Sequence, residues 1–459
     1  MKIAVLSAAL ASLLAMGTAT AADAPDANAA RAALDALAAD TGGADAPGCA
    51  IAVYRDGKLD SLHASAMANL ETSTPLDGDS LFYAASVSKQ FTALAVMVLA
   101  GQDKLSLDDD IRKHIPELPA YAQPITVRML LQHSSGVMDS LSLLALAGQP
   151  QASQATMQEA LALVLKQPQT NFTPGTEVTY SNGAYLLLAE LVHRRSGERF
   201  ADFVKTQVLD PMGMRDSYVL DGKAPTSAHL AQGYVPHGDG YAIRNTYPRF
   251  GGSGGLMVTL NDLARYEYDI EHGHRVWTPR VRAEMERPGV LGNGTPARDS
   301  ADDLTYASGL QAGRRQGRDV VQHGGGAEAF KHMYVRVPAR KLGVAAFWNR
   351  RDIVPQDVAV DGLDGLLGAA PDDVPPAPAA GRYRAQSLDA DYIVSRRGER
   401  LLIDIVPAQA QVPTHSIELR RNASGDYSGD GATLKPLDGE DGFTLGTSRA
   451  RGLRVLPAR

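Results

Sequence analysis

The stretch SVSKQFTALAVMVLAG, residues 86–101, restricts the fold of this chain more than any other feature. It predicts a helix that is apolar on almost every side and that ends at Gly101. Such a helix has to lie inside a large hydrophobic core, because no face of it is suited to water. Lys89 stands at its beginning, and a buried lysine costs free energy unless it has a partner or a chemical task.

Ser86 and Lys89 form an S-x-x-K pattern. Three residues span nearly one helical turn, so both side chains lie on one face. Ser86 falls at the helix N-terminus, where unpaired N–H groups and the helix dipole favour negative charge. A desolvated lysine can lose its proton and then accept the proton of a serine. The simpler interpretation is that Ser86 caps the helix and Lys89 reaches solvent, and the pattern alone does not exclude it.

Two later segments contain polar groups that could relay protons or bind a substrate. Tyr180-Ser181-Asn182 precedes an apolar helix, and His323-Gly324-Gly325-Gly326 follows an apparent strand. A phenol can relay protons, and an asparagine amide can hold a substrate amide through both its donor and its acceptor. Glycines at a strand edge let a ligand approach the backbone closely. Each segment alone could equally be an ordinary turn.

The stretch FGGSGG, residues 250–255, offers a competing nucleophile, because it contains a formal G-x-S-x-G centred on Ser253. Together with HGGG it suggests an α/β-hydrolase. That fold needs the serine directly between a strand and a helix, with the HGGG loop earlier in the chain. Here the residues before Ser253 are polar and interrupted by proline, and HGGG comes later. The order therefore disfavours Ser253 as nucleophile.

Strand patterns lie at both ends of the main region and helical patterns lie between them. Apolar runs flank Asp56-Gly57, and another pair of runs flanks residues 338–341, so each predicts a β-hairpin. The fold class that follows is α+β, with an antiparallel sheet flanked by helices and an inserted helical subdomain. A Pro/Ala-rich linker, residues 368–380, precedes short alternating runs over 381–459, which predict a small, all-β, barrel-like domain.

The N-terminus and the composition limit where the protein acts and what it binds. Residues 1–21 resemble a secretory signal with cleavage near Ala21, so we expect a periplasmic or secreted protein without a membrane span. The formal net charge of −7 argues against nucleic acid as a partner. Cys49 is the only cysteine and reads as a buried structural thiol. His272 and His274 lack companion ligands, so we expect no metal or cofactor.

The order and wide spacing of S-x-x-K, Y-S-N and H-G-G resemble the serine β-lactamase and penicillin-binding protein superfamily. The resemblance is greatest to its branch of class C β-lactamases, esterases and D-aminopeptidases. Further stretches are similar to that branch, namely LLQHSSG at 130–136, LDPMGM at 209–214 and GGSGGLMVTLNDLARY at 251–266. The likeness covers residues 28–367 and implies a β-lactamase/transpeptidase-like fold.

The resemblance also implies roles for individual residues. Ser86 would be the nucleophile, with Lys89 and Tyr180 sharing acid and base duty. Asn182, His323 and Gly325 would contact the substrate. The backbone N–H groups of Ser86 and Gly326 would form the oxyanion hole. Two departures stand out: His323 replaces the lysine of many relatives, and Ala329 replaces a usual glycine.

The expected activity is hydrolysis of an ester or amide bond through an acyl-enzyme on Ser86. Because histidine is mostly uncharged at neutral pH, binding of carboxylates should weaken, which favours small esters, amides or substrates containing D-amino acids. A DD-carboxypeptidase, a β-lactamase and a sensor that acylates without turnover stay open as alternatives. The sequence leaves open the physiological substrate and the oligomeric state, and also whether the C-terminal domain narrows the site or only stabilises the protein.

Overall fold

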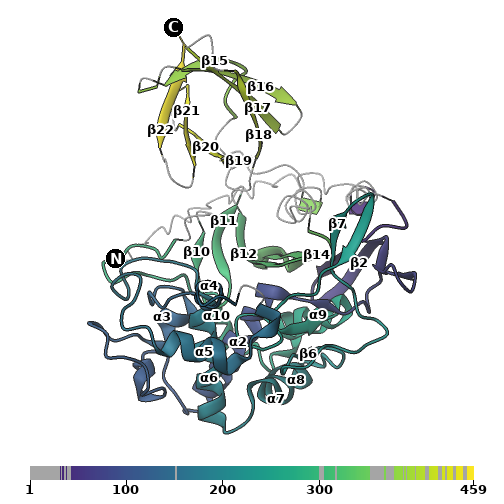
Figure 1. The fold of residues 1–459 in the computed structure, drawn as a ribbon, viewed down its shortest axis with the longest axis vertical. Coiled ribbons are helices and arrows are strands. Elements are labelled where there is room, and N and C mark those ends of the chain that lie inside the picture. Colours follow the sequence, from purple (N-terminus) through teal and green to yellow (C-terminus); the bar gives the residue numbers. More distant parts are fainter. Residues whose placement is uncertain are drawn as a thin grey trace, which may run out of the picture.

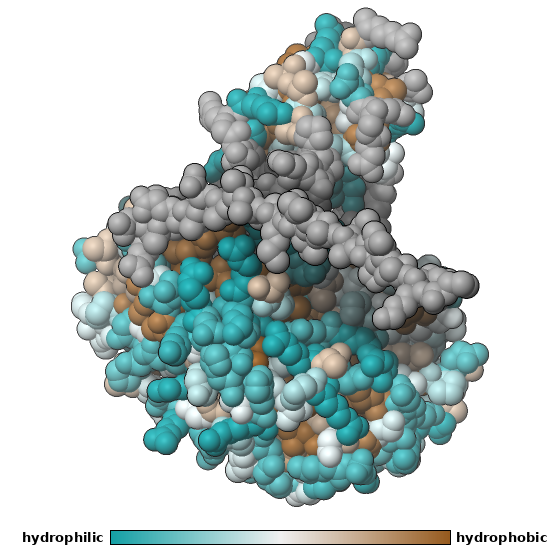
Figure 2. Space-filling view, turned by 180° about the vertical axis from the view of Figure 1, so that it is seen from behind, coloured by the Kyte–Doolittle hydropathy of each residue, from teal (hydrophilic) through white to brown (hydrophobic). Residues whose placement is uncertain are grey.

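The computed structural model describes residues 43–149, 152–298, 304–315, 318–351 and, with short gaps, 377–458, together with residues 32, 34, 35, 38, 366 and 367. The predicted signal peptide and most of the predicted linker lie outside the described residues. No helix in the described part of the chain combines the length and apolar character needed to cross a membrane. On the face drawn in Figure 2, hydrophilic residues cover most of the larger part of the molecule, with hydrophobic residues between them.

A seven-stranded antiparallel sheet forms the middle of the larger part (Figure 1), in the order β10-β11-β12-β13-β14-β1-β2. The strands are β1 (Cys49–Arg55), β2 (Lys58–Ser65), β10 (Thr305–Tyr306), β11 (Gln311–Arg315), β12 (Arg318–Ala327), β13 (Phe330–Val337) and β14 (Leu342–Trp348). Strand β1 pairs with β14 from the far end of the domain. The prediction of a sheet built from both ends is therefore confirmed.

Helices cover one face of this sheet and share its main core. They include α2 (Lys89–Gly101), α3 (Val127–Leu131), α4 (Ser140–Leu146), α5 (Met157–Leu165), α6 (Asn182–Ser196), α7 (Phe200–Val204), α8 (Asp210–Met212), α9 (Leu260–Tyr268) and α10 (Pro279–Met285). Helix α2 is buried along most of its length, as its apolar sequence requires. A second core on the other face includes Leu34 and Ala38, packed with Leu366 and Leu367.

The C-terminal part is a closed antiparallel barrel, drawn above the sheet and helices in Figure 1. Its strands are β15 (Gly381–Ala385), β16 (Ala390–Arg397), β17 (Arg400–Pro407), β18 (His415–Arg421), β19 (Tyr427–Gly429), β20 (Ala432–Pro436), β21 (Phe443–Thr447) and β22 (Leu453–Pro457). Buried side chains such as Tyr383, Tyr392 and Phe443 form its interior. The predicted fold class, α+β with a small β-barrel, is confirmed.

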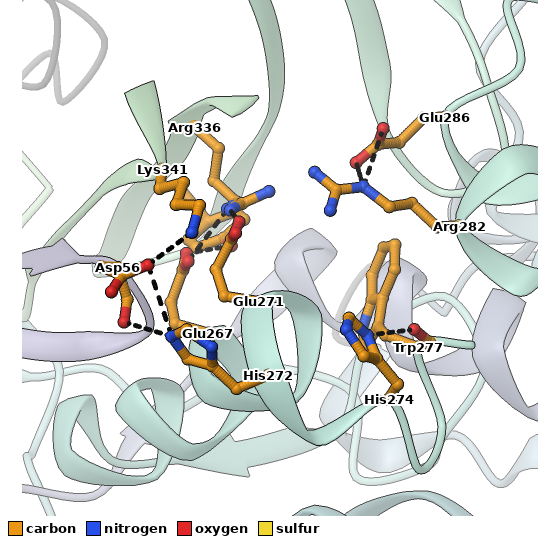
Figure 3. A network of polar contacts seen from close by, with 11 residues as sticks. Asp56, Glu267, Glu271, His272, His274, Trp277, Arg282, Glu286, Arg336 and Lys341 are labelled. Carbon is orange, nitrogen blue, oxygen red and sulfur yellow. Dashed lines mark hydrogen bonds and ion pairs between the residues drawn. The ribbon is translucent and has the colours of Figure 1, made fainter. Parts of the chain in front are cut away.

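A buried ion pair fastens the sheet to α9 (Figure 3). Arg336 on β13 donates from Nε to Glu267 over 2.9 Å, and both side chains are only 1% exposed. Glu267 also accepts from the Tyr334 hydroxyl, and Glu271 binds the guanidinium from the next helical turn. Burial opposes the charge of Arg336, but Glu267 and the groups around it outweigh that effect and raise the arginine pKa.

The two histidines of the His272-Gly273-His274 segment have separate partners (Figure 3). His272 Nε2 lies 2.9 Å from the backbone oxygen of Asp56, and His274 Nδ1 lies 3.3 Å from that of Trp277. Among the described residues, no three His, Cys, Asp or Glu side chains gather where they could hold a metal ion. His272 therefore joins its segment to the turn at Asp56, whereas His274 holds its own loop.

Replacing Arg336 by Met should lower the free energy of unfolding by about 3–5 kcal/mol, because Glu267 would stay buried without its partner. Lys341→Met is the matched control, since Lys341 pairs with Asp56 at a site where both side chains are about half exposed, and it should cost about 0–1 kcal/mol. Urea denaturation measures both changes. Equal losses in the two variants would contradict an anchoring role for the buried pair.

Candidate active site

The S-x-x-K segment begins with a tight turn before α2. Residues Ala85–Ser88 form the 3-10 helix η1, whereas the sequence predicted one continuous helix from Ser86. The difference has a local cause at Ser88. Its hydroxyl donates to the Ala85 carbonyl and accepts from the N–H of Leu256, which begins strand β9 (Leu256–Val258). These bonds hold the turn that presents Ser86 at the surface of the core.

Lys89 is completely buried, and its ammonium nitrogen contacts three oxygen atoms. They belong to the Ser86 hydroxyl at 3.1 Å, the Asn182 side chain at 3.0 Å and the Ser253 backbone at 2.6 Å. Burial lowers the pKa of Lys89 to about 7, and Asp139 opposes that shift. The lysine therefore exchanges its proton near neutral pH.

Counting hydrogen-bond donors shows what the uncharged lysine can do. A neutral amine has two N–H groups and one lone pair. The amide oxygen of Asn182 and the carbonyl oxygen of Ser253 can only accept, so they take both N–H groups. The lone pair is then left for the Ser86 hydroxyl, which is the geometry needed to remove its proton.

Tyr180 approaches the same hydroxyl from the other side. Its phenol lies 2.7 Å from Ser86 Oγ and can donate a proton to it. Ser181 caps α6 by accepting from the N–H of Ala184, which leaves Tyr180 just outside the helix and Asn182 as its first residue. The structure thus brings Ser86, Lys89, Tyr180 and Asn182 together.

Buried His133 supports the loop that carries Tyr180. Its Nδ1 accepts from the N–H of Ser181 at 3.1 Å, and its ring lies 4.4 Å from the ring of Tyr180. Burial, followed by the nearby charge of Lys89, lowers the pKa of His133 far below its usual value. These contacts give His133 a structural role beside the active site.

Strand β12 provides the third segment. Strand β11 pairs only with residues 318–322 of β12, so in the described part of the chain residues 323–327 are paired on one side alone, with β13. Gly325 faces η1 so closely that an added Cβ would lie 2.7 Å from the Ala84 carbonyl oxygen. Gly326 belongs to the same stretch, residues 323–327, which has no strand partner on its second edge among the described residues. This edge can accept an extended ligand as an additional strand.

His323 sits on this segment as an uncharged side chain. Its Nδ1 lies 2.6 Å from the Gly324 carbonyl oxygen, which only accepts, so Nδ1 carries the hydrogen. Its Nε2 then accepts from the hydroxyl of Tyr306 at 2.5 Å. Burial, together with the charge of Lys89, lowers the pKa of His323 to about 3. Both ring nitrogens are therefore occupied by protein groups.

Ser253 contributes its backbone carbonyl and lies in the turn that positions Lys89. The fold also lacks the required chain order for an α/β-hydrolase, since the HGGG segment follows Ser253 and lies within β12. Sequence reasoning missed three participants: Asp139, Tyr306 and this carbonyl. Neither Asp139 nor Tyr306 stands in a recognisable motif, and a backbone oxygen such as that of Ser253 leaves no mark on residue identity.

The fold and this cluster define a class of protein, the serine hydrolases with a β-lactamase/transpeptidase-like architecture. Residues 32–368 match the Beta-lactamase family. The chain belongs to that family.

Named relatives and a solved structure agree with this assignment. A D-aminopeptidase of Gluconobacter oxydans is 28% identical over 80% of this chain, and the match covers 66% of that longer protein. Penicillin-binding protein 4* of Bacillus subtilis is 27% identical, over 85% of this chain and 88% of its own length. The octameric penicillin-binding protein homologue of Pyrococcus abyssi has a TM-score of 0.67 at 23% identity, covering 94% of this chain and 99% of that one. The similarity to the Pyrococcus abyssi protein shows a shared fold.

Gly325→Ala should push β12 away from η1, because the new methyl group would meet the Ala84 carbonyl oxygen at 2.7 Å. A displacement of this kind should lower the rate of ester hydrolysis about 100-fold. Gly324→Ala is the control, since its Cβ would make only an ordinary contact, 3.7 Å from the His332 carbonyl oxygen. Initial rates and melting temperatures of both variants test this. Comparable activity in the two variants would rule out the close approach as a requirement.

Proposed function

We propose that the protein hydrolyses an ester or amide bond through an acyl-enzyme on Ser86. One observation carries the proposal: the Ser86 hydroxyl lies between Lys89 Nζ at 3.1 Å and the Tyr180 phenol at 2.7 Å. The lysine has a pKa of about 7 and its lone pair is free for the serine proton. A nucleophile, a matched base and a second proton carrier therefore meet at one oxygen.

In the first step, Ser86 Oγ attacks the substrate carbonyl carbon while its proton passes to Lys89. The backbone N–H groups of Ser86 and Gly326 stabilise the negative charge that forms on the carbonyl oxygen. When the bond to the leaving group breaks, the proton reaches the departing amine or alcohol through Tyr180. In the second step, water attacks the Ser86 ester and releases the acid, with the same two side chains carrying its protons.

We infer the substrate class from the third segment, residues 323–326, in which the His323 side chain is uncharged. Since His323 is neutral and both its nitrogens are occupied, it offers no fixed positive charge to a carboxylate. We therefore favour small esters, amides or peptides with an N-terminal D-residue over β-lactams and C-terminal carboxylates. The similarity to a D-aminopeptidase supports the amide within this class. The open edge of β12, with Gly325 and Gly326, would pair with the backbone of such a substrate.

We further propose that the protein acts after export, with its first 21 residues removed as a signal peptide. The support lies in the sequence, which has an early lysine, a short apolar run and an A-x-A site ending at Ala21. The buried side chains of the β-barrel form an apolar core, so we assign the barrel no chemistry and propose that it either narrows substrate entry or stabilises the protein.

A serine-directed fluorophosphonate should label Ser86, and Ser86→Ala should abolish both labelling and hydrolysis. Peptide mapping identifies the labelled residue, and the intact mass from a secreting host shows whether the chain begins at Ala22.

A panel of p-nitrophenyl esters, D-amino-acid amides, D-Ala-D-Ala peptides and a chromogenic β-lactam then compares kcat/KM. Labelling at Ser253 would overturn the assignment. Stoichiometric acylation without turnover would indicate a sensor, and efficient β-lactam turnover would contradict the proposed substrate class.

The pH dependence of kcat/KM should report the ionisation of Lys89. Only the uncharged amine can take the serine proton, so the rate should fall about tenfold per pH unit below the lysine pKa, which lies at about 7. The measurement uses a neutral ester between pH 5 and 9, so that the substrate carries no titrating group. The rate of fluorophosphonate labelling should follow the same curve. A rate independent of pH across this range would exclude Lys89 as the base.

A further inference from the structure

Asp139 joins the N-termini of two helices beside the active site. Its Oδ1 accepts from the backbone N–H of Ser142 at 2.8 Å and from the Ser142 hydroxyl at 2.9 Å, which caps α4. Its Oδ2 accepts from the backbone N–H of Asn182 at 2.8 Å and from the Asn182 side-chain Nδ2 at 2.8 Å, at the start of α6. The carboxylate thus receives four hydrogen bonds in a partly buried position.

The bond from Nδ2 fixes which way the amide of Asn182 points. A carboxylate only accepts, so the NH₂ group of Asn182 has to face Asp139. The amide oxygen is then turned toward Lys89, whose Nζ lies 3.0 Å away. In the flipped amide, an NH₂ group would face Lys89, where it could donate only to the lone pair of the neutral amine, and that lone pair would then be lost to Ser86. Asp139 therefore selects the orientation in which Asn182 can hold the lysine.

Asp139 also acts on the charge of Lys89. The groups that face the ammonium include the rings of Tyr180 and Tyr185, at 4.6 Å and 5.4 Å from Nζ to the ring centroids. Buried His133 and His323 are uncharged neighbours, since burial and then Lys89 itself lower their pKa values. Asp139 is the carboxylate that raises the lysine pKa against the larger effect of burial.

We propose that Asp139 is a positioning residue for the acyl transfer, which orients the Asn182 amide and through it holds Lys89 against Ser86. The inference rests on the function proposed above. Asp139 reaches the reacting atoms only through Asn182 and through its charge, so its removal has two separable consequences. The amide loses its fixed orientation, and the lysine loses a nearby negative charge.

Asp139→Asn keeps the size of the side chain but can no longer accept from both Ser142 and Asn182 through two oxygens. We expect kcat/KM for a neutral ester to fall about 10–100-fold at its optimum, as for other small displacements of catalytic groups. The acidic limb of the pH profile should move to lower pH, because the lysine would lose its neighbouring carboxylate. A loss of stability alone would not move this limb.

Thr156→Ala is the matched control for the loss of a helix cap. Thr156 caps α5 through its hydroxyl in the same way that Asp139 caps α4, within a capping box completed by Glu159. The control should lower the melting temperature while leaving kcat/KM and the pH profile unchanged. If Asp139→Asn behaves like this control, the positioning role is wrong.

A double-mutant cycle with Asn182→Ala separates the two consequences. If Asp139 acts on the rate through Asn182, then Asp139→Asn should lower kcat/KM much less in the Asn182→Ala background, while the shift of the acidic limb persists. Full additivity of the two losses would overturn the inference. Failure of the wild-type protein to take a fluorophosphonate at Ser86 would instead contradict the proposed function, so the two failures are distinguishable.

Discussion

The active site depends on the burial of one ammonium group among uncharged partners. Removing Lys89 from water favours its neutral form, and the oxygens of Asn182 and Ser253 direct its lone pair toward Ser86. These oxygens come from segments far apart in the chain, so their alignment requires a rigid fold. A displacement of either one would let the amine turn and would leave the serine hydroxyl without a base.

The fold supplies that rigidity by fixing each segment to the same core. Helix α2 is buried along most of its length, and β12 closely approaches Ala84, just before η1, because Gly325 has no side chain. On the neighbouring strand β13, Arg336 binds Glu267 of α9 deep in the protein. The edge of β12 thus carries no side chains at residues 324–326, while its neighbouring strand is firmly held.

Local patterns made much of this architecture predictable. Hairpins around Asp56-Gly57 and residues 338–341 follow from short-range turn signals, and the three motifs located the side chains that the structure brings together. Asp139 and Tyr306 could not be found in this way. Their importance depends on the packing of α4 against α6 and on the contact of Tyr306 in β10 with His323 in β12, two strands that β11 separates in the sheet order. No spacing in the sequence reveals these contacts. The edge of β12 that has no strand partner among the described residues likewise depends on where β11 begins, at Gln311 opposite Gln322.

The pairing of β1 with β14 has a consequence for biosynthesis. The Gly48 N–H donates to the side chain of Asn349, 301 positions further along the chain. Until the ribosome has made β14, the hairpin of β1 and β2 has no neighbouring strand, and an isolated hairpin is only marginally stable in water. Such long-range contacts slow folding because a large loop must close before they form. The sheet therefore assembles only when nearly the whole domain has been synthesised, and until then its apolar first strand needs protection from aggregation.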